Sequence, residues 1–387
     1  MDKITNVYLD FASTTPISGE VYREMLSAIN DNFGNAESLY AQGRQAKQTL
    51  EDARAKIAKA IGASASEIYF TSGSTEGNNW ALKGIARANR SKGNHIITSM
   101  VEHPSVLKAC HALEKEGFEV TYLPVDNFGV VDYTELVKAI RPETILISIQ
   151  SANGDVGTIQ PIRAIAELAK LNEIPFHTDA TYAIGALPCN VHEMNISALT
   201  LTGHKIFAPK GVGVLYVKKG IKIADILSGE PVADVPSIAA LSKAVTIVTE
   251  NLDENNKRLK ALRKYFLKQL SEKVHNITLN GHPTQRLLSN INISFEGAEG
   301  ESVVYALDKL GVSAATCSAC ASDELKACPS LAACGLEQDI VQNSVRFSIS
   351  PDTTQEEIDF AIGAIYKAVK KVRSVSAVRI YKNKVEL

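Results

Sequence analysis

The chain has 387 residues, of which 45% are hydrophobic and 22% are charged. This size and composition predict a soluble globular protein with room for two domains, each with its own hydrophobic core. The formal net charge of −2 provides no broad basic surface, so we expect neither nucleic acid nor a membrane as a partner. The first residues lack the profile of a signal peptide and no apolar run is long enough to span a bilayer, so a cytoplasmic location is the default expectation.

The first two-thirds of the chain predicts an α/β fold. After an initial strand over residues 7–12 and a turn over residues 13–16, a long amphipathic helix is expected over residues 39–61. Short apolar strands then alternate with helical patterns, over residues 68–71, 95–98, 120–123, 144–148, 174–177, 196–201 and 211–217. This alternation is typical of a mainly parallel sheet with helices on both faces, which binds ligands at the carboxyl ends of its strands.

The last third has a different rhythm and predicts a smaller α+β domain. The expected elements are a helical stretch over residues 235–270 that links the domains, strands over 291–295 and 344–347, a helix over 301–310, and a final helix with a capping start at residues 353–357. We therefore predict a large domain over residues 15–255 and a small domain over residues 1–14 and 256–387, which carries a cysteine-rich loop.

Lys205 follows one of the expected strands, in the sequence Leu201-Thr202-Gly203-His204-Lys205. A lysine that is held rigidly there can lose its proton when it is desolvated and can attack a carbonyl, as Schiff-base lysines do. Taken alone, an ordinary surface lysine at a strand end is the more common interpretation.

Three other strand ends carry residues that suit a phosphorylated ring. Residues 72–79 form a Gly/Ser/Thr turn that opens a helix, and its free N–H groups suit a phosphate. The turn lacks the patterns of nucleotide-binding loops. His103 precedes a helix-starting proline and can act as a base or stack on a ring, and Asp179 can pair with a protonated ring nitrogen. Together with Lys205, these are the four features that pyridoxal phosphate requires.

Further motifs extend along nearly the whole chain. They are Leu9-Asp10 with Ala12 and Thr14-Thr15-Pro16, Phe33-Gly34-Asn35, Phe70 through Asn79, Val101-Glu102-His103, Gly157 through Pro161, His177-Thr178-Asp179-Ala180, Gly203-His204-Lys205, and Ser344-Val345-Arg346-Phe347-Ser348. With these motifs the chain resembles the pyridoxal-phosphate enzymes of the class V aminotransferase type, and among them the cysteine desulfurases of the NifS/IscS group. The resemblance implies a fold-type I transferase whose large domain binds the cofactor.

The resemblance also implies a role for each matching residue. Lys205 would form the Schiff base, Asp179 would pair with the ring nitrogen, and His103 would stack on the ring and take part in catalysis. The remaining cofactor contacts would come from Ser74, Thr75, Asn153, Tyr182, Thr202 and His204, with Thr75, Thr202 and His204 on the phosphate. Asn35 and Arg346 would receive the substrate carboxylate, which suits the bidentate fork of an arginine.

The sulfur chemistry is likewise implied by the resemblance. The nucleophile of the family lies in a Gly-Ser-Ala-Cys loop, and this chain reads Cys317-Ser318-Ala319-Cys320. Cys320 would attack the sulfur of L-cysteine as a thiolate and keep it as a persulfide, with release of L-alanine. The partners implied are a sulfur-acceptor protein, either an Fe–S cluster scaffold or a tRNA-thiolation enzyme, and a second subunit in a homodimer.

Two other cysteines follow that loop. We interpret Cys328 and Cys334 as small packing residues and expect no metal site, because their spacing matches no common zinc or ferredoxin pattern. A disulfide or a persulfide relay between Cys317 and Cys320 is a further hypothesis.

Three departures from the family pattern predict a divergent cofactor pocket that retains pyridoxal phosphate less tightly. Gly154 stands where the family has the second asparagine of Asn-Asn-Glu, and Tyr182 stands where a glutamine contacts the ring hydroxyl. The segment before Pro236 is shortened and lacks an Arg-x-Gly-Thr run, whose threonine reaches the phosphate of the neighbouring subunit.

Two other functions stay open at this point. One is a related pyridoxal-phosphate lyase that acts on selenocysteine or cysteine sulfinate. The other is a catalytically degenerate paralogue that binds a partner without turnover. The departures favour the paralogue, whereas the presence of Lys205, Asp179, His103, Arg346 and Cys320 argues against it.

Overall fold

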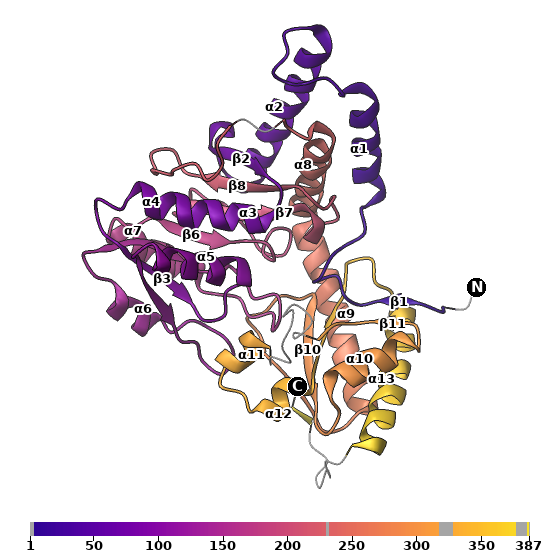
Figure 1. The fold of residues 1–387 in the computed structure, drawn as a ribbon. Coiled ribbons are helices and arrows are strands. Elements are labelled where there is room, and N and C mark those ends of the chain that lie inside the picture. The colour runs from indigo at the N-terminus through magenta and orange to yellow at the C-terminus, as the bar shows by residue number, and fades with distance from the viewer. Residues whose placement is uncertain (1–3, 230–231, 317–327, 377–384, 387) are drawn as a thin grey trace.

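A seven-stranded sheet organises the first two-thirds of the chain (Figure 1). The computed structural model describes residues 4–229, 232–316, 328–376 and 385–386. The strands lie in the order β2-β8-β7-β6-β5-β3-β4; β8 runs antiparallel to β2 and β7, and the other neighbouring pairs are parallel. Their bounds are β2 Ile68–Thr71, β3 His95–Ser99, β4 Glu119–Leu123, β5 Thr144–Ser148, β6 Phe176–Asp179, β7 Ala198–Thr202 and β8 Gly213–Val217. The predicted α/β fold with a mainly parallel sheet is confirmed.

Helices cover both faces of this sheet, because successive residues of a strand point to opposite sides. Ile97 and Ile147 belong to the hydrophobic core on one face, and their neighbours Ile96 and Leu146 belong to the core on the other. The first core is covered by α1 Gly19–Asp31, α2 Ala41–Ile61, α6 Tyr133–Ala139, α7 Ile162–Leu171 and α8 Val235–Glu250. The second is covered by a continuous helical run of α3 Ser74–Asn79, η2 Trp80–Gly84 and α4 Ile85–Ala88, together with α5 Pro104–Lys115.

A separate core belongs to the last third of the chain and to the N-terminal segment. A four-stranded sheet of order β12-β10-β9-β13 contributes to this core. A second, two-stranded sheet pairs β1 with β11 in parallel. The bounds are β1 Val7–Tyr8, β9 Ile277–Leu279, β10 Asn290–Phe295, β11 Val312–Ser313, β12 Ser344–Ser348 and β13 Val385–Glu386, with α9 Leu252–Lys273, α10 Gly300–Asp308 and α13 Gln355–Val375 as the covering helices. Val7 and Leu9 lie in this core. The predicted domain boundaries near residues 15 and 255 stay a prediction.

The stretch over residues 235–270 is helical as predicted, but it consists of two helices, and the break between them was not predicted. Asn251 ends α8 and precedes α9, and Asp253 and Glu254 lie in the first turn of α9. Asparagine competes for local hydrogen bonds outside a helix, and acidic residues stabilise a helix start, so the break is favoured by this sequence. The link itself is as expected: α8 packs against α1 and α2, and α9 packs against α13.

Three smaller differences concern element ends. β6 begins at Phe176 rather than residue 174, since Pro175 has no N–H group to donate to a neighbouring strand. Residues 180–197, which leave room for a helix, form turns instead, and β1 ends at Tyr8. The capping start of the last helix is confirmed, because Thr354 and Glu357 form a capping box.

No helix in the described part of the chain is long and apolar enough to cross a membrane.

The buried imidazole of His95 on β3 makes the fold sensitive to acid. Its two ring nitrogens each lie 2.8 Å from a threonine hydroxyl, of Thr144 and Thr121. Burial, assisted by the charge of Arg141, lowers the pKa of His95 to about 4. The unfolded chain therefore binds a proton near pH 6.5, about the ordinary histidine pKa, while the folded chain does not.

We predict that the protein loses stability as the pH falls from about 6.5 towards 4, and that His95→Gln reduces this loss. The check is the difference in melting temperature between pH 7 and pH 5 for both proteins. Other buried histidines keep some acid sensitivity in the variant. An equal difference in the two proteins would contradict the assignment to His95.

Candidate active site

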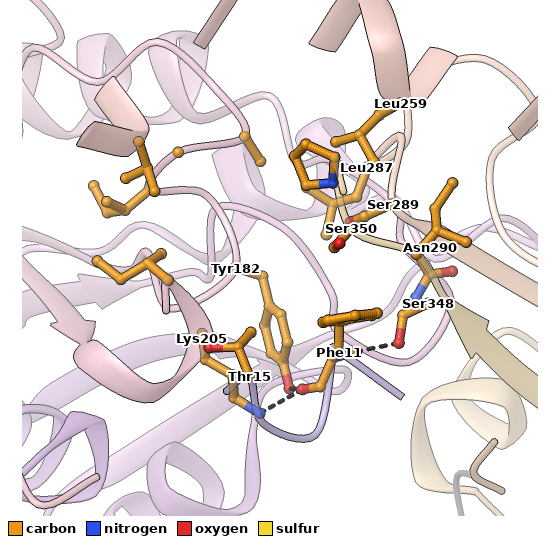
Figure 2. Close-up of a pocket in the computed structure, with 18 of the residues that line it drawn as sticks. Phe11, Thr15, Tyr182, Lys205, Leu259, Leu287, Ser289, Asn290, Ser348 and Ser350 are labelled. Atoms are coloured by element: carbon orange, nitrogen blue, oxygen red, sulfur yellow. Dashed lines mark hydrogen bonds between the residues drawn. The ribbon is translucent and has the colours of Figure 1, made fainter. Parts of the chain in front are cut away.

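Lys205 lies at the carboxyl end of β7, where the short helical turn η3 Gly203–Lys205 follows the strand. Its Nζ atom donates hydrogen bonds to the carbonyl oxygens of Ala12 and Ser13 and lies 4.9 Å from the centre of the Tyr182 ring. Lys205, Tyr182 and Ala12 line a cavity of about 100 Å³, in which Lys205 and Tyr182 converge on the carbonyl group of Ala12 (Figure 2). The lysine is therefore held by the strand behind it and by the N-terminal segment beside it.

The register of the sheet places the turn after β2 next to the turn after β7. Thr71 and Thr202 are both paired with Gly213 of β8, one on each side. Beyond them, Ser74, Thr75, Thr202, His204 and Lys210 line one open cleft of about 300 Å³. The structure thus brings together Thr75, Thr202 and His204, the three residues predicted to contact the phosphate, with Ser74, a predicted cofactor contact, and it adds a cation, Lys210.

Gly73 shapes the floor of this cleft. Its φ of +145° is a conformation that residues with a side chain rarely adopt, so the turn needs a glycine there. Ser74 then begins α3, and the first N–H groups of a helix have no partner within the helix. A phosphate in the cleft would meet those N–H groups together with hydroxyl and cationic side chains.

His204 lies at the edge of the same cleft. Its Nδ1 atom is 3.3 Å from the hydroxyl oxygen of Thr14. Burial lowers the pKa of His204 to about 4, and the charges of Lys205 and Lys210 act in the same direction. The imidazole is neutral at pH 7 and has one N–H group to donate.

His103 is the N-cap residue of α5, as its position before Pro104 predicted. The backbone N–H of Ser105 donates to its Nδ1 atom at 3.1 Å, so the neutral ring carries its proton on Nε2. Burial lowers the pKa of His103, while the carboxylate of Asp179 opposes that shift. A neutral, flat ring at this position is suited to stacking on another ring.

Asp179 is the last residue of β6 and is buried. Its two carboxylate oxygens accept hydrogen bonds from the side chain of Asn78 at 2.7 Å and from the backbone N–H of Thr181 at 2.9 Å. Asn78 also donates to the hydroxyl of Ser105 at 2.9 Å, and that hydroxyl lies 2.7 Å from Nδ1 of His103. A chain of hydrogen bonds therefore connects the two residues predicted to contact the ring.

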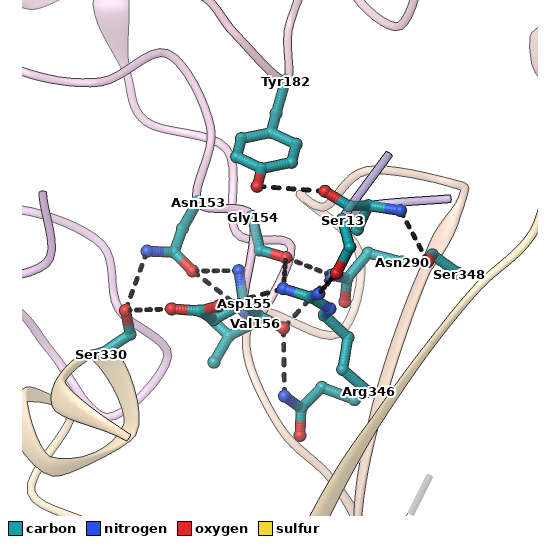
Figure 3. Close-up of polar contacts among 12 residues, drawn as sticks. Ser13, Asn153, Gly154, Asp155, Val156, Tyr182, Asn290, Ser330, Arg346 and Ser348 are labelled. Carbon is teal, nitrogen blue, oxygen red and sulfur yellow. Dashed lines mark hydrogen bonds and ion pairs between the residues drawn. The ribbon is translucent and has the colours of Figure 1, made fainter. Parts of the chain in front are cut away.

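Arg346, at the centre of β12, is buried between the carboxylates of Asp10 and Asp155. Figure 3 shows it beside Asp155 and Ser13. One terminal nitrogen lies 3.2 Å from Asp155, and the other lies 3.1 Å from Asp10 and 2.8 Å from the hydroxyl of Ser13. Ser13 thus touches both key cations, since its carbonyl oxygen accepts from Lys205 and its hydroxyl from Arg346.

The side chains of two predicted site residues, Asn35 and Asn153, are hydrogen-bonded to other groups of the protein in this structure. The side chain of Asn35 is exposed and accepts from the N–H of Glu37 at 3.0 Å. The amide of Asn153 donates to Val101 and Ser330 and accepts from two N–H groups of its own turn, those of Asp155 and Val156. Their roles at the carboxylate and at the cofactor stay predictions.

Of the cysteines at positions 317, 320, 328 and 334, the structure describes the last two. Cys317 and Cys320 lie outside the described residues. Cys328 and Cys334 are buried at the two ends of α11 Pro329–Ala333. Cys328 packs in a small core with Val156 and Leu331, which agrees with its interpretation as a packing residue.

Sequence reasoning missed Asn78, Ser105 and Asp155 as parts of the site. Asn78 and Ser105 follow the motif residues Thr75 and His103 by three and two positions, so their place near those motifs was the available signal. Their contacts join separate strand ends, and no local pattern encodes such pairs.

Known proteins share the sequence and the fold of this chain. A sequence profile of the class V aminotransferases matches residues 7–230 and 229–360. The chain belongs to the class V aminotransferase family. It is 47% identical over 378 residues to a cysteine desulfurase IscS of Methanosarcina thermophila, with 96% of this chain and 93% of the relative covered. It is 43% identical over 378 residues to a cysteine desulfurase IscS of Dictyoglomus turgidum, with 96% of each covered.

Solved structures agree. A NifS-like protein superposes with a TM-score of 0.89 at 31% identity, over 95% of this chain and 100% of that one. Within the class V aminotransferases, the chain therefore falls in the IscS and NifS-like group.

The described residues fit pyridoxal phosphate, the cofactor that this family implies. A cleft with hydroxyl and cationic groups adjoins Lys205, and a buried carboxylate and a neutral histidine lie beyond it. The hydroxyl of Thr181 lines the lysine cavity, is buried and has no hydrogen-bond partner in the described part of the structure. A polar ligand would satisfy such a group.

We predict that Asn78→Ala weakens the binding of pyridoxal phosphate roughly tenfold or more, because a hydrogen bond to the buried carboxylate of Asp179 is lost. A titration followed by absorbance measures the affinity. Asn79→Ala is the matched control, since the neighbouring amide donates only to the carbonyl of Thr75 among its described contacts. Equal affinities of the two variants would contradict the role of Asn78.

Proposed function

We propose that this protein is a cysteine desulfurase that uses pyridoxal phosphate, converts L-cysteine to L-alanine and transfers the sulfur to Cys320. The proposal rests on one observation: Lys205 and Arg346 both donate hydrogen bonds to Ser13, to its carbonyl oxygen and to its hydroxyl group. An α-amino acid carries its amine and its carboxylate on one carbon, and this site offers a lysine for amine chemistry and an arginine for the carboxylate within the reach of one residue.

Each described residue has a task in this proposal. Lys205 would hold the cofactor and accept the α-proton of the substrate. Asp179, whose carboxylate oxygens accept hydrogen bonds from Asn78 and Thr181, would pair with the ring nitrogen. His103 would stack on the ring, and the cleft of Thr75, Thr202 and His204 would receive the phosphate. When bound, pyridoxal phosphate supplies an electron sink for the carbanion at Cα.

The sulfur step balances without an external oxidant. L-Cysteine and the thiol of Cys320 give L-alanine and a persulfide on Cys320, as the C–S bond of the substrate breaks and an S–S bond forms. The thiolate is the reactive form. The assignment of Cys320 rests on the family motif.

The direct test of the proposal is the production of alanine and sulfide from L-cysteine by the protein loaded with pyridoxal phosphate. We expect both products with a thiol reductant, and alanine that stalls after about one turnover without it, because the persulfide then has no acceptor. Cys320→Ala should abolish both. Steady alanine without reductant would indicate a lyase, and no alanine at all would indicate the inactive paralogue.

We predict that Arg346→Lys raises the KM for L-cysteine roughly tenfold or more, since lysine lacks the bidentate fork. Lysine retains the positive charge that Asp10 and Asp155 require in the fold. Steady-state kinetics measure the change, with kcat less affected than KM. A KM equal to that of the wild type would place the substrate carboxylate elsewhere.

A homodimer is the assembly that we propose. Tyr22, Leu26 and Ile29 follow each other at helical spacing along α1, Phe33 lies just beyond its end, and all four are exposed to between 43% and 74%. The opposite side of α1 packs against α8. Such a stripe of apolar side chains is suited to a second copy of the chain. The sulfur acceptor, an Fe–S scaffold or a tRNA-thiolation enzyme, and a cytoplasmic location belong to the same proposal.

We predict that Leu26→Glu together with Ile29→Glu converts the dimer to a monomer, because charges replace the centre of the stripe. Light scattering after size-exclusion chromatography gives the mass. Leu171→Glu, at an exposed leucine on α7, is the control that should stay dimeric. If the double variant kept the mass of the wild-type assembly, the exposed face of α1 would not be the dimer interface.

A further inference from the structure

Gly154 lies directly against the ring of Tyr182. A Cβ atom at position 154 would be 2.2 Å from Cζ and 2.3 Å from Cε2 of Tyr182, and 2.7 Å from its hydroxyl oxygen. Carbon atoms pack at about 3.5–4.0 Å, so a side chain at position 154 and the ring at position 182 exclude each other.

The backbone does not require this glycine. Gly154 is absent from the glycines with positive φ in the described chain, so its conformation is one that other residues adopt. In contrast, neighbouring Gly157 has a φ of +82° and is required by its turn. The constraint on residue 154 therefore comes from Tyr182.

The ring of Tyr182 also forms one wall around Lys205. The Tyr182 hydroxyl donates to the carbonyl oxygen of Ala12 at 3.2 Å, and the Nζ atom of Lys205 donates to that same oxygen. The Nζ atom is 4.9 Å from the ring centre, within the range of a cation–π contact. Figure 3 shows the hydroxyl of Tyr182 turned towards the segment that precedes Ser13. The ring and the carbonyl groups of Ala12 and Ser13 together fix the position of the amine.

We propose that Gly154 and Tyr182 form one steric unit, in which the missing side chain at position 154 admits the Tyr182 ring, and that this ring is a positioning residue for Lys205. The second part rests on the proposed function, since it concerns the attachment of pyridoxal phosphate to Lys205. On this account, the departures at positions 154 and 182 are a single coupled exchange: position 154 cannot gain a side chain, and position 182 cannot lose its ring, without cost.

The steric unit is tested first, on the cofactor-free protein. Gly154→Ala should lower the melting temperature, because its methyl group meets the ring. In a Tyr182→Gln background the same substitution should be neutral or raise the melting temperature, since alanine restricts the unfolded chain. Gly363→Ala is the control, as a Cβ there meets nothing within 4 Å. The same loss for Gly154→Ala in both backgrounds would overturn the steric unit.

The positioning role is tested by how readily Lys205 takes up pyridoxal phosphate. After incubation with limiting cofactor and reduction with borohydride, mass spectrometry of the Lys205 peptide gives the fraction modified. Tyr182→Phe keeps the ring and should resemble the wild type. Tyr182→Leu removes the ring and adds no polar group, and it should show an apparent affinity roughly threefold to tenfold weaker.

The outcomes separate the two claims. Equal modification of Tyr182→Leu and the wild type would overturn the positioning role while leaving the proposed function intact. A wild-type protein that is not modified at Lys205 would overturn the proposed function and the positioning role together. The melting-temperature comparison would still decide the steric unit, because it uses no cofactor.

Discussion

The segment of residues 9–15 is the part of the chain on which the site depends, because it joins the two cores. On one side, its main chain is hydrogen-bonded to Ser348 of β12 at 2.7 Å and 2.8 Å. On the other side, it is hydrogen-bonded to the carbonyl oxygen of His204 in η3 at 2.9 Å. Arg346 lies on β12 and Lys205 lies in η3, so this segment sets the distance between the two cations. The seven-stranded sheet alone would present Lys205 without Arg346, the residue that we propose binds the substrate carboxylate.

Charge explains how the same site remains stable without a substrate. A buried guanidinium group needs an anionic partner, and loss of that partner is strongly destabilising. Arg346 has two such partners, Asp10 and Asp155, whose side chains are 18% and 30% exposed. The carboxylate of an amino acid has the same charge and shape and can replace one of them. Asp155 is the more exposed of the two and returns to water at the lower cost, so the exchange leaves no buried charge unpaired.

Much of the fold could be predicted because the central strands are buried on both faces and read as continuous apolar runs. β5 was predicted with its observed bounds, and β7 was displaced by only a few residues. The break at Asn251 was missed because the apolar pattern continues across it, and the start of β6 was missed because Pro175 lies within an apolar run. Within the site, Lys205, His103 and Asp179 were predictable because each lies at or shortly after the carboxyl end of a strand. Asn78 and Asp155 were not, because their partners lie on distant parts of the chain and only the folded geometry brings them together.

The central claim is that Lys205 and Arg346 act on the two ends of one amino acid. A crystal structure of the protein with pyridoxal phosphate and L-cysteine tests it most directly. We expect the cofactor to lie beside Lys205 and the substrate carboxylate to pair with Arg346. Asp155 should then have moved away from the guanidinium group. A substrate carboxylate that binds elsewhere, with Arg346 still held between Asp10 and Asp155, would contradict the account.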